Sequence, residues 1–518
     1  MIKKILMAAG LAVALASSQA ADKALVGAFD VGPGGLQGNF NPLAATAGFT
    51  WLSKYYEPLI AYDQTLDGLV GVLAQSYGVS PDQLTYTFKL ADAKWHDGRP
   101  FSAKDVRFTL GLAANSKSGS VFAARLENLE KVELPNDKTV VLRLRKPTAS
   151  FLDTLSKIMM LPEHSLGGIA VQDLPKNAYW SSQPVGTGPF KWGRYVTDQY
   201  VELQAFEGYR GGAPAVPRLI NRFFANSAAA VAALRAGEIQ FSYVEANDVA
   251  TFAGNKDFRV IEGDSYVVNY LGFNQLTPLW KDGRVRQAVM HAINRDAIIK
   301  SLYNGAAKPA HCVYTAARLQ PKELNPYAYD PDKARKLLAE AGWDKINGKK
   351  PITVLTYYNN PLATNTLAAI QAMLAQVGIQ IVPRAVDTPT YNATVMGSNP
   401  KPDDFAMVYA GLQNGPDASN INIGLNAKQV PPAGTNIMRV DMPAVTDALD
   451  KALAEPDPAR REREFANVCR ATNAELPWAT LWVAKRYGVA SAKLDRFVWL
   501  PAPGGGPYAD EAQKWSWK

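Results

Sequence analysis

Histidine and cysteine, the side chains that most often carry nucleophilic, acid–base or metal chemistry, are scarce in this chain. Its 518 residues include only four histidines, His96, His164, His291 and His311. No pair has the H-E-x-x-H spacing of a zinc protease, and no G-x-S-x-G marks an exposed nucleophilic serine. His96 lies in a Trp-His-Asp-Gly turn and His291 on an apolar helix face, so we expect structural roles for both. These patterns argue against an enzyme, and we expect no catalytic residue, no metal site and no cofactor.

The two cysteines, Cys312 and Cys469, leave two alternatives open. In an oxidising compartment they could form one disulfide, and otherwise they would be two separate buried thiols. Their sequence separation says nothing about their distance in space. The chain has no C-x-x-C, so neither redox catalysis nor a zinc ribbon is expected.

Residues 1–20 have the composition of a cleavable export signal. Lys3 and Lys4 precede an apolar run over residues 5–16, and Ser18-Gln19-Ala20 supplies small residues for cleavage after Ala20 or Ala21. The apolar run is shorter than the roughly 20 residues that span a bilayer. Residue 21 is Ala rather than Cys, so no lipid anchor is expected. The sequence therefore predicts a soluble periplasmic protein.

Composition and charge indicate an ordinary globular protein of more than one domain. The chain is 47% hydrophobic and 20% charged, with a formal net charge of +8. No long basic run accompanies this charge, so no nucleic-acid partner is expected. The roughly 500 residues after the signal exceed what one core organises, so we expect two or three domains.

Strand-like and helix-like patterns alternate along the chain, which predicts an α/β fold. The segment 86–110 opens with Tyr86, Phe88 and Leu90 alternating with polar residues, as in a half-buried strand, and a Trp-His-Asp-Gly turn follows at 95–98. Ser102 then occupies the N-cap position of an expected helix, with Asp105 three residues later.

Four further segments follow in order. Residues 185–192, Val-Gly-Thr-Gly-Pro-Phe-Lys-Trp, predict a tight turn that leads into a strand. Residues 285–296 have apolar residues at helical spacing and predict one helix. Residues 334–343 predict a helix that ends at Gly342. Residues 370–382 predict a helix that stops near Gly378 and is followed by a strand.

The five segments, in this order, resemble the peptide/nickel-type extracytoplasmic solute-binding proteins of ABC importers, called family 5. The resemblance covers essentially the whole chain after the signal, and it implies a protein that captures a solute without transforming it. It also implies a bilobal clam of the type II periplasmic-binding-protein kind, with an extra subdomain in the first lobe. The implied divisions are a signal peptide (1–20), the opening segment of the first lobe (21–59), an inserted subdomain of that lobe (60–180), its continuation (181–269), the second lobe (270–480) and a C-terminal return to the first lobe (481–518). Chain crossings near 265–272 and 478–486 would form the hinge.

The resemblance also suggests where a ligand would bind. Family members that hold dipeptides use an Arg after a strand for the carboxylate and an Asp for the amino group. Residues 356–361 contain no Arg, and in residues 410–417 the only acid is Asp417. Both departures weigh against a free dipeptide. We expect ligand contacts from Asn39, Phe40, Asn41, Trp51, Tyr357, Asn359, Tyr409, Gln413, Asn414 and Asp417. The alternative is core packing for each aromatic residue, and an N-cap or turn for Asp417.

The function that the resemblance implies is the periplasmic binding component of an ABC importer. It would capture peptides, oligopeptides rather than free dipeptides, and deliver them to the transmembrane subunits of a permease. The alternative is the same role for an oligosaccharide, an opine or another polar solute. A nickel-chelate binder and a secreted hydrolase are more distant interpretations. We expect a monomer.

Overall fold

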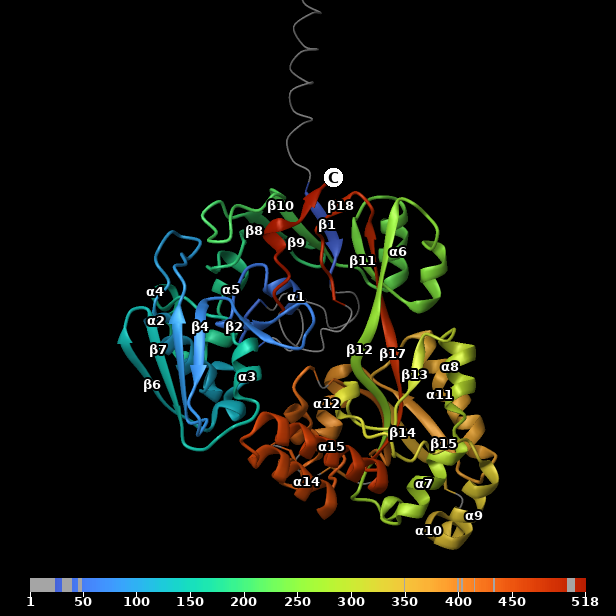
Figure 1. Ribbon diagram of the computed structural model, residues 1–518. Coiled ribbons are helices and arrows are strands. Elements are labelled where there is room, and N and C mark those ends of the chain that lie inside the picture. Colours follow the sequence, from blue (N-terminus) through green and yellow to red (C-terminus); the bar gives the residue numbers. More distant parts are fainter. Residues whose placement is uncertain are drawn as a thin grey trace, which may run out of the picture.

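The computed structural model describes residues 24–29, 40–44, 49–348, 350–397, 400–401, 404–413, 415–431, 434–500 and 508–518, without the side chains of residues 49, 50 and 413. The expected signal peptide, residues 1–20, lies outside these ranges. Figure 1 shows two halves joined by two long strands, β12 and β17. In the described residues, no helix is both long and apolar enough to cross a membrane.

One large mixed sheet runs through both halves. Its strands, in spatial order, are β15 (Ile381–Ala385), β14 (Ile352–Thr356), β16 (Met407–Gln413), β12 (Phe258–Phe273), β17 (Trp478–Ser491), β11 (Phe241–Val244), β1 (Leu25–Ala28), β10 (Arg218–Arg222), β9 (Tyr200–Ala205) and β8 (Phe190–Val196), and β13 (Ala307–Pro309) also pairs with β17. β1 is parallel to β10 and β11, and β14 is parallel to β15 and β16. Parallel pairs with intervening helices confirm the α/β prediction.

The two long strands carry the chain from one half to the other. β12 pairs with β16 over Val267–Phe273, whereas β17 pairs with β11 over Tyr487–Ala490. Between these regions the β12–β17 register shifts after Asp264 and resumes at Val268. An irregular pairing of this kind bends a strand locally. It falls at the edge of the segment expected to act as a hinge, and the hinge role itself stays a prediction.

A separate four-stranded sheet forms the left side of Figure 1, in the order β4 (Ala74–Val79), β5 (Thr85–Leu90), β7 (Thr139–Leu144) and β6 (Leu129–Asn136). As the alternation predicted, β5 buries Tyr86, Phe88 and Leu90. Helix α2 (Ala103–Ala113) begins where the sequence places its cap. The Ser102 N–H donates to the Asp105 carboxylate at 2.9 Å. Helix α3 (Phe151–Lys157) follows β7 in the chain.

The other half carries most of the longer helices, which are α7 (Gly283–Ala292), α8 (Arg295–Leu302), α9 (Pro331–Ala341), α11 (Pro361–Ala375), α12 (Thr388–Val395), α14 (Pro443–Ala454) and α15 (Pro458–Glu475). The prediction of one helix over residues 285–296 is wrong. The helix stops at Ala292, and the Asn294 side chain caps the next helix by accepting from the Ala297 N–H at 2.9 Å. Gly342, at φ 71°, ends α9 as predicted.

The Trp-His-Asp-Gly turn and the Val-Gly-Thr-Gly segment are bonded to each other. The Gly186 N–H donates to His96 Nδ1 at 3.1 Å, and His96 Nε2 lies 3.0 Å from the Gly188 carbonyl. A Cβ added at Gly186 would lie 2.1 Å from the Tyr55 carbonyl oxygen, and one at Gly188 would lie 2.6 Å from that of Lys54. Close backbone approach, rather than a left-handed turn, therefore requires both glycines.

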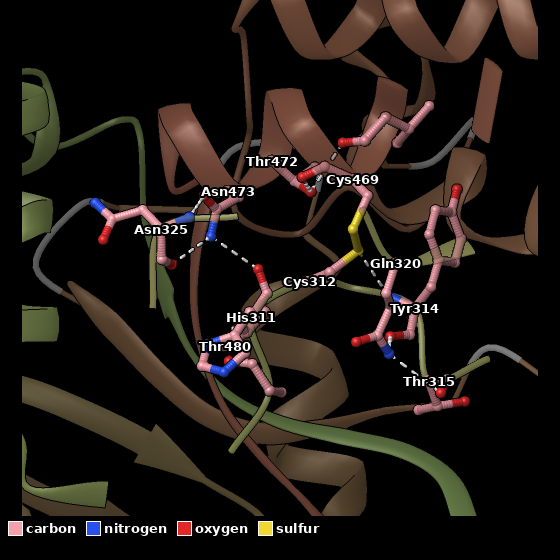
Figure 2. Close-up of a disulfide and its surroundings, with 12 residues drawn as sticks. His311, Cys312, Tyr314, Thr315, Gln320, Asn325, Cys469, Thr472, Asn473 and Thr480 are labelled. Atoms are coloured by element: carbon pink, nitrogen blue, oxygen red, sulfur yellow. Dashed lines mark hydrogen bonds between the residues drawn. A yellow bond between two sulfur atoms is a disulfide. The ribbon is translucent and has the colours of Figure 1, made fainter. Parts of the chain in front are cut away.

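Cys312 and Cys469 form a disulfide, which decides between the two alternatives left open by the sequence. Their Cα atoms are 5.3 Å apart, and the bond joins α15 to the segment that follows β13 (Figure 2). Beside it, the Asn473 side-chain amide donates to the His311 carbonyl at 2.9 Å. The disulfide lies within one half of the molecule and does not tie the two halves together.

Candidate ligand-binding site

Helix α3 brings a buried ion pair to the face of the first half. Asp153 and Lys157 are four residues apart on this helix, so their side chains lie on one face. Lys157 Nζ is 2.7 Å from Asp153 Oδ2, and both residues are less than a tenth exposed. The hydroxyl of Tyr62, at the end of β2 (Ile60–Tyr62), donates to Asp153 Oδ1 at 3.1 Å. The carboxylate is therefore held in place from two elements.

Asp417, in the second half, lines the same cavity as Asp153. It precedes a short 3₁₀ helix, Ala418–Ile421, and its Oδ1 accepts from the Ser419 N–H at 2.8 Å and the Ser419 hydroxyl at 2.7 Å. Asp417 is thus an N-cap, and its contact with a ligand stays a prediction. The cap orients the carboxylate without neutralising it, since neither donor is charged.

The two halves meet directly beside these carboxylates. The Asn420 side-chain amide donates to Asp153 Oδ2 at 3.2 Å, and its oxygen accepts from Arg125 Nη1 at 3.0 Å. Asn420 belongs to the second half, whereas Arg125 and Asp153 belong to the first. One carboxamide therefore bridges two charged groups of the opposite half.

A cavity of about 310 Å³ lies between the halves at this place, and we call it the acidic cavity. The charged residues in its wall are four acids and two arginines, Asp67, Asp153, Asp417, Glu462, Arg318 and Arg461. Even with Lys157 included, negative charge is in excess. Burial, and then the neighbouring Asp153 charge, raise the pKa of Asp417 to about 6. A cationic ligand group would relieve that repulsion.

A second cavity of about 200 Å³ adjoins the crossing strands, and we call it the hinge cavity. Tyr358 and Tyr409 line it from one half, and Tyr243 and Glu245 from the other. The Arg486 guanidinium lies 4.8 Å from the centre of the Tyr243 ring. Burial, and then Asp248, raise the pKa of Glu245. Aromatic surface with a few polar groups is typical of a small-molecule site.

Comparison with known proteins decides the family. The profile of the bacterial extracellular solute-binding proteins, family 5, matches residues 68–428. The chain belongs to this family. A Brucella melitensis biotype 1 protein, provisionally named an ABC transporter peptide-binding protein, is 67% identical over 490 residues, which cover 95% of this chain and 93% of that protein.

More distant members of the family also match over nearly the full length. The glutathione-binding protein GsiB of Escherichia coli O1:K1 / APEC is 30% identical, over 87% of each chain. The oligopeptide-binding protein AppA of Bacillus subtilis, solved with a nonapeptide, superposes with a TM-score of 0.83 at 24% identity, covering 96% of this chain and 99% of AppA. This likeness establishes the bilobal fold of type II periplasmic binding proteins.

The residues predicted to contact ligand in this solute-binding protein fall into separate places. Phe40, Asn41 and Trp51 are 1–2% exposed and belong to the core of the first half. The Phe40 ring packs edge-on against Trp192, with centroids 5.0 Å apart. Tyr409 is also buried, beside Tyr358 at the hinge cavity.

The remaining predicted residues are more accessible or lie outside the described residues. Tyr357 is half-buried and contacts Tyr391, with ring centroids 5.0 Å apart, and Asn359 is exposed. Asn39 and Asn414 fall outside the described residues, as does the Gln413 side chain. Asp417 lines the acidic cavity and is not grouped with Tyr409, which lines the hinge cavity.

Sequence reasoning missed Asp153, Lys157, Asn420 and Arg125. The four-residue spacing of Asp153 and Lys157 was a signal of a helical ion pair. No local pattern, however, indicated that this pair is buried or that it faces residues some 260 positions later. In the described residues, no three or more His, Cys, Asp and Glu side chains gather as a metal site.

Proposed function

We propose that this protein is the peptide-binding component of an ABC importer. It captures a peptide between its two lobes and presents it to the transmembrane subunits of a permease. The observation that carries the proposal is the pair of carboxylates, Asp153 and Asp417, that opposite lobes contribute to one cavity. The peptide-binding name of a relative with 67% identity supports the same ligand class.

The acidic cavity suits the ammonium group of a peptide. Asp417 is polarised by its cap, and Asp153 shares its charge with Lys157, so one negative charge remains for a ligand cation. A charge-assisted hydrogen bond to such a group is shorter and about twice as strong as a neutral one. Because the carboxylates come from different lobes, a bound ammonium would also favour the closed arrangement.

Oligopeptides are the favoured class. Residues 356–361 supply no Arg for the carboxylate of a free dipeptide. The two arginines of the acidic cavity already have partners, since Arg318 pairs with Glu462 at 3.3 Å and Arg461 donates to Gln83. A longer peptide places its carboxylate elsewhere. An oligosaccharide, an opine or another polar solute is the alternative, since the Tyr357 and Asn359 side chains could bind hydroxyl groups. A nickel chelate and a hydrolytic activity are less favoured, given the four scattered histidines.

The proposal includes the setting in which the protein works. Residues 1–20 would direct export and be removed, leaving a soluble periplasmic monomer without a lipid anchor. The lobes would follow the expected divisions, with the subdomain at 60–180 and the second lobe at 270–480. They would close by bending where β12 and β17 cross between them, near 265–272 and 478–486.

Thermal unfolding of residues 21–518 with a ligand panel tests this proposal. The panel contains peptides of two to six residues, oligosaccharides, opines and nickel–histidine. A ligand present at 100 times its Kd adds about 2.7 kcal/mol to the free energy of unfolding. For a protein of this size that is a rise of roughly a few degrees in Tm. Stabilisation by sugars or opines without any by peptides would overturn the peptide assignment.

A further inference from the structure

The wall of the acidic cavity belongs to both lobes, so the cavity forms only when the lobes lie close together. Asp67 and Asp153 come from the first lobe, whereas Asp417 and Glu462 come from the second. Figure 1 shows α3, which carries Asp153, on the side of the first lobe that faces α14 and α15. Opening of the lobes would therefore move the acids of one lobe away from the acids of the other.

Two of these four acids have a cationic partner, and two do not. The ion pairs are Asp153 with Lys157 at 2.7 Å and Glu462 with Arg318 at 3.3 Å. Arg461, the second arginine of the wall, instead donates to Gln83 and to the Glu455 carbonyl. Among the described residues, neither Asp67 nor Asp417 forms an ion pair. Negative charge is therefore left over where the lobes meet.

Asp417 is buried among charged and titratable groups of both lobes. Burial, and then the Asp153 charge, raise its pKa to about 6, whereas Lys157 acts in the opposite direction with a smaller effect. The groups that face it are Tyr62 on β2, Asp153 and Lys157 on α3, Tyr314 in the segment after β13 and, in the rest of the cavity wall, Asp67, Tyr77, Arg318, Arg461 and Glu462. Burial raises the pKa of Tyr62 and Tyr314, so these two hydroxyls are uncharged.

Two opposing interactions between the lobes meet at Asp153. The Asn420 amide donates to its carboxylate at 3.2 Å, which favours closure. Asp417, from the same lobe as Asn420, repels that carboxylate, and like charges repel more strongly when they are buried than in water. Tyr62 and Lys157 belong to the lobe of Asp153, so its carboxylate keeps both partners when the lobes separate. The protonation state of Asp417 therefore decides which interaction prevails.

We propose that the acidic cavity is a proton-dependent switch of lobe closure: the charged Asp417 keeps the ligand-free protein open by repelling Asp153, and uptake of one proton by Asp417 lets the lobes close. A proton that binds more tightly to the closed state shifts the population toward that state. Closed protein would not admit a ligand, so acid would lower the rate of capture. The switch acts without any ligand, so it does not depend on the ligand being a peptide.

Single-molecule fluorescence energy transfer on ligand-free protein, residues 21–518, tests the inference. Dyes are attached through Gln172→Cys in the first lobe and Ala339→Cys on α9 in the second, while the disulfide stays oxidised. Both positions are exposed and lie outside the wall of the acidic cavity. The ratio of closed to open molecules is measured at pH 7, 6.5, 6, 5.5 and 5, and melting temperatures check that the protein is folded throughout.

Three variants separate the charge of Asp417 from other contacts between the lobes. Asp417→Asn removes the titrating group, and its amide oxygen can still accept the Ser419 bonds, because Asn caps helices as well as Asp does. Asp153→Asn removes the other charge of the repelling pair. The control is Asn247→Ala, which removes an uncharged contact between the lobes, the 2.7 Å bond that the Asn304 amide donates to the Asn247 oxygen. Neither asparagine lines the acidic cavity.

We expect the closed-to-open ratio of the unaltered protein to rise about tenfold from pH 7 to pH 5, as a pKa raised by closure requires. Asp417→Asn should already reach at pH 7 the ratio that the unaltered protein reaches at pH 5, and its ratio should change less than twofold with pH. Asp153→Asn should also lose most of the pH response. Asn247→Ala should have a lower ratio at every pH and keep the full response to acid.

Two results would overturn the switch. One is a closed-to-open ratio of the unaltered protein that stays constant from pH 7 to pH 5. The other is a response to acid that Asp417→Asn or Asp153→Asn retains in full, since a different group would then control closure. Either result would leave the peptide assignment standing, because no ligand is present in the experiment.

Discussion

Asn420 of the second lobe donates its side-chain amide to Asp153 of the first lobe, at 3.2 Å. This contact joins residues 267 positions apart. The carboxylate that it contacts is already held by Tyr62 and Lys157, so it is a fixed acceptor and not a mobile surface group. The contact therefore joins the two lobes at Asp153, which lines the acidic cavity.

A second contact between the lobes joins the β4–β5 turn to the start of α15. Gln83, in the turn between β4 and β5, donates to the Pro456 carbonyl and accepts from Arg461 Nη1 at 3.3 Å. The turn holds Gln83 at φ 55°, a left-handed conformation that is uncommon for a residue with a side chain. Pro456 and Arg461 flank the start of α15. The hairpin thus extends from the subdomain to the second lobe, where it contacts Arg461 of the acidic cavity wall.

Gln83→Ala should speed ligand release because the contact forms only when the lobes close. A contact absent from the open state contributes to the dissociation barrier rather than to encounter. We expect the dissociation rate constant, measured by stopped-flow tryptophan fluorescence, to rise about two- to tenfold with the association rate constant unchanged. Gln172→Ala, at an exposed position outside the contact, is the control. An equal change in both variants would show that Gln83 has no role in closure.

Peptide affinity should depend on pH through Asp417. Its pKa is raised to about 6 from 3.8, so the ligand-free protein holds a proton there below pH 6. An incoming ammonium favours the charged form, so binding releases this proton, and affinity should fall by up to tenfold per unit as pH drops from 6 toward 4. Titration calorimetry at pH 7, 6, 5 and 4.5 measures the profile.

Asp417→Asn should bind free-amine peptides at least tenfold more weakly at pH 7 and lose the pH dependence. A wild-type affinity that is constant over this range would exclude Asp417 from the ammonium site.

Much of the fold could be predicted from local sequence because local physics determines it. The alternation of Tyr86, Phe88 and Leu90 predicts a half-buried strand wherever the strand packs, and Gly342 predicts a helix end from its own backbone freedom. The prediction of a single helix over residues 285–296 was wrong because a local cap outweighed the apolar pattern. Apolar spacing continues through Ile293, and the capping preference of Asn294 decides the break.

The candidate site was harder to predict because it consists of pairings between distant segments. Asp417 could be singled out as the one acid of its loop. Its pKa, however, is raised by burial and then by Asp153, which lies in the other lobe. Phe40 and Trp51 were predicted to contact ligand, and both are buried in the core. Aromatic residues suit a ligand wall and a core equally well, and only the tertiary packing shows that these two lie in the core of the first half.

Acid should destabilise the protein through His96. Burial lowers its pKa from 6.5 to about 4, and its Nδ1 accepts the Gly186 N–H, a bond that a protonated ring cannot accept. A lowered pKa means that the unfolded chain binds more protons between pH 6.5 and 4, so stability falls as pH falls through this window. The loss should total about 3 kcal/mol, from 1.36 kcal/mol for each pKa unit. Urea unfolding at pH 7, 6, 5 and 4 measures it.

His96→Gln separates this histidine from the other titrating groups. The variant should be less stable at pH 7, because it loses the fitted ring, and its stability should fall less between pH 6.5 and 4 than that of the unaltered protein. Asp417 titrates in the same window with the opposite sign, since its pKa is raised. The comparison therefore uses the difference between the two proteins. Parallel stability profiles would show that His96 does not control the acid response.

Removing the disulfide should lower stability without changing ligand affinity. Cys312 and Cys469 are buried and close a loop of 157 residues, which typically corresponds to about 2–5 kcal/mol because the cross-link restricts the unfolded chain. The double variant Cys312→Ala, Cys469→Ala should therefore have a lower Tm by calorimetry, whereas either single variant also leaves a free thiol. Peptide affinity should remain within twofold, since neither cysteine lines the acidic cavity or the hinge cavity. A large loss of affinity in a folded double variant would mean that the disulfide positions the ligand-binding loop at Asp417.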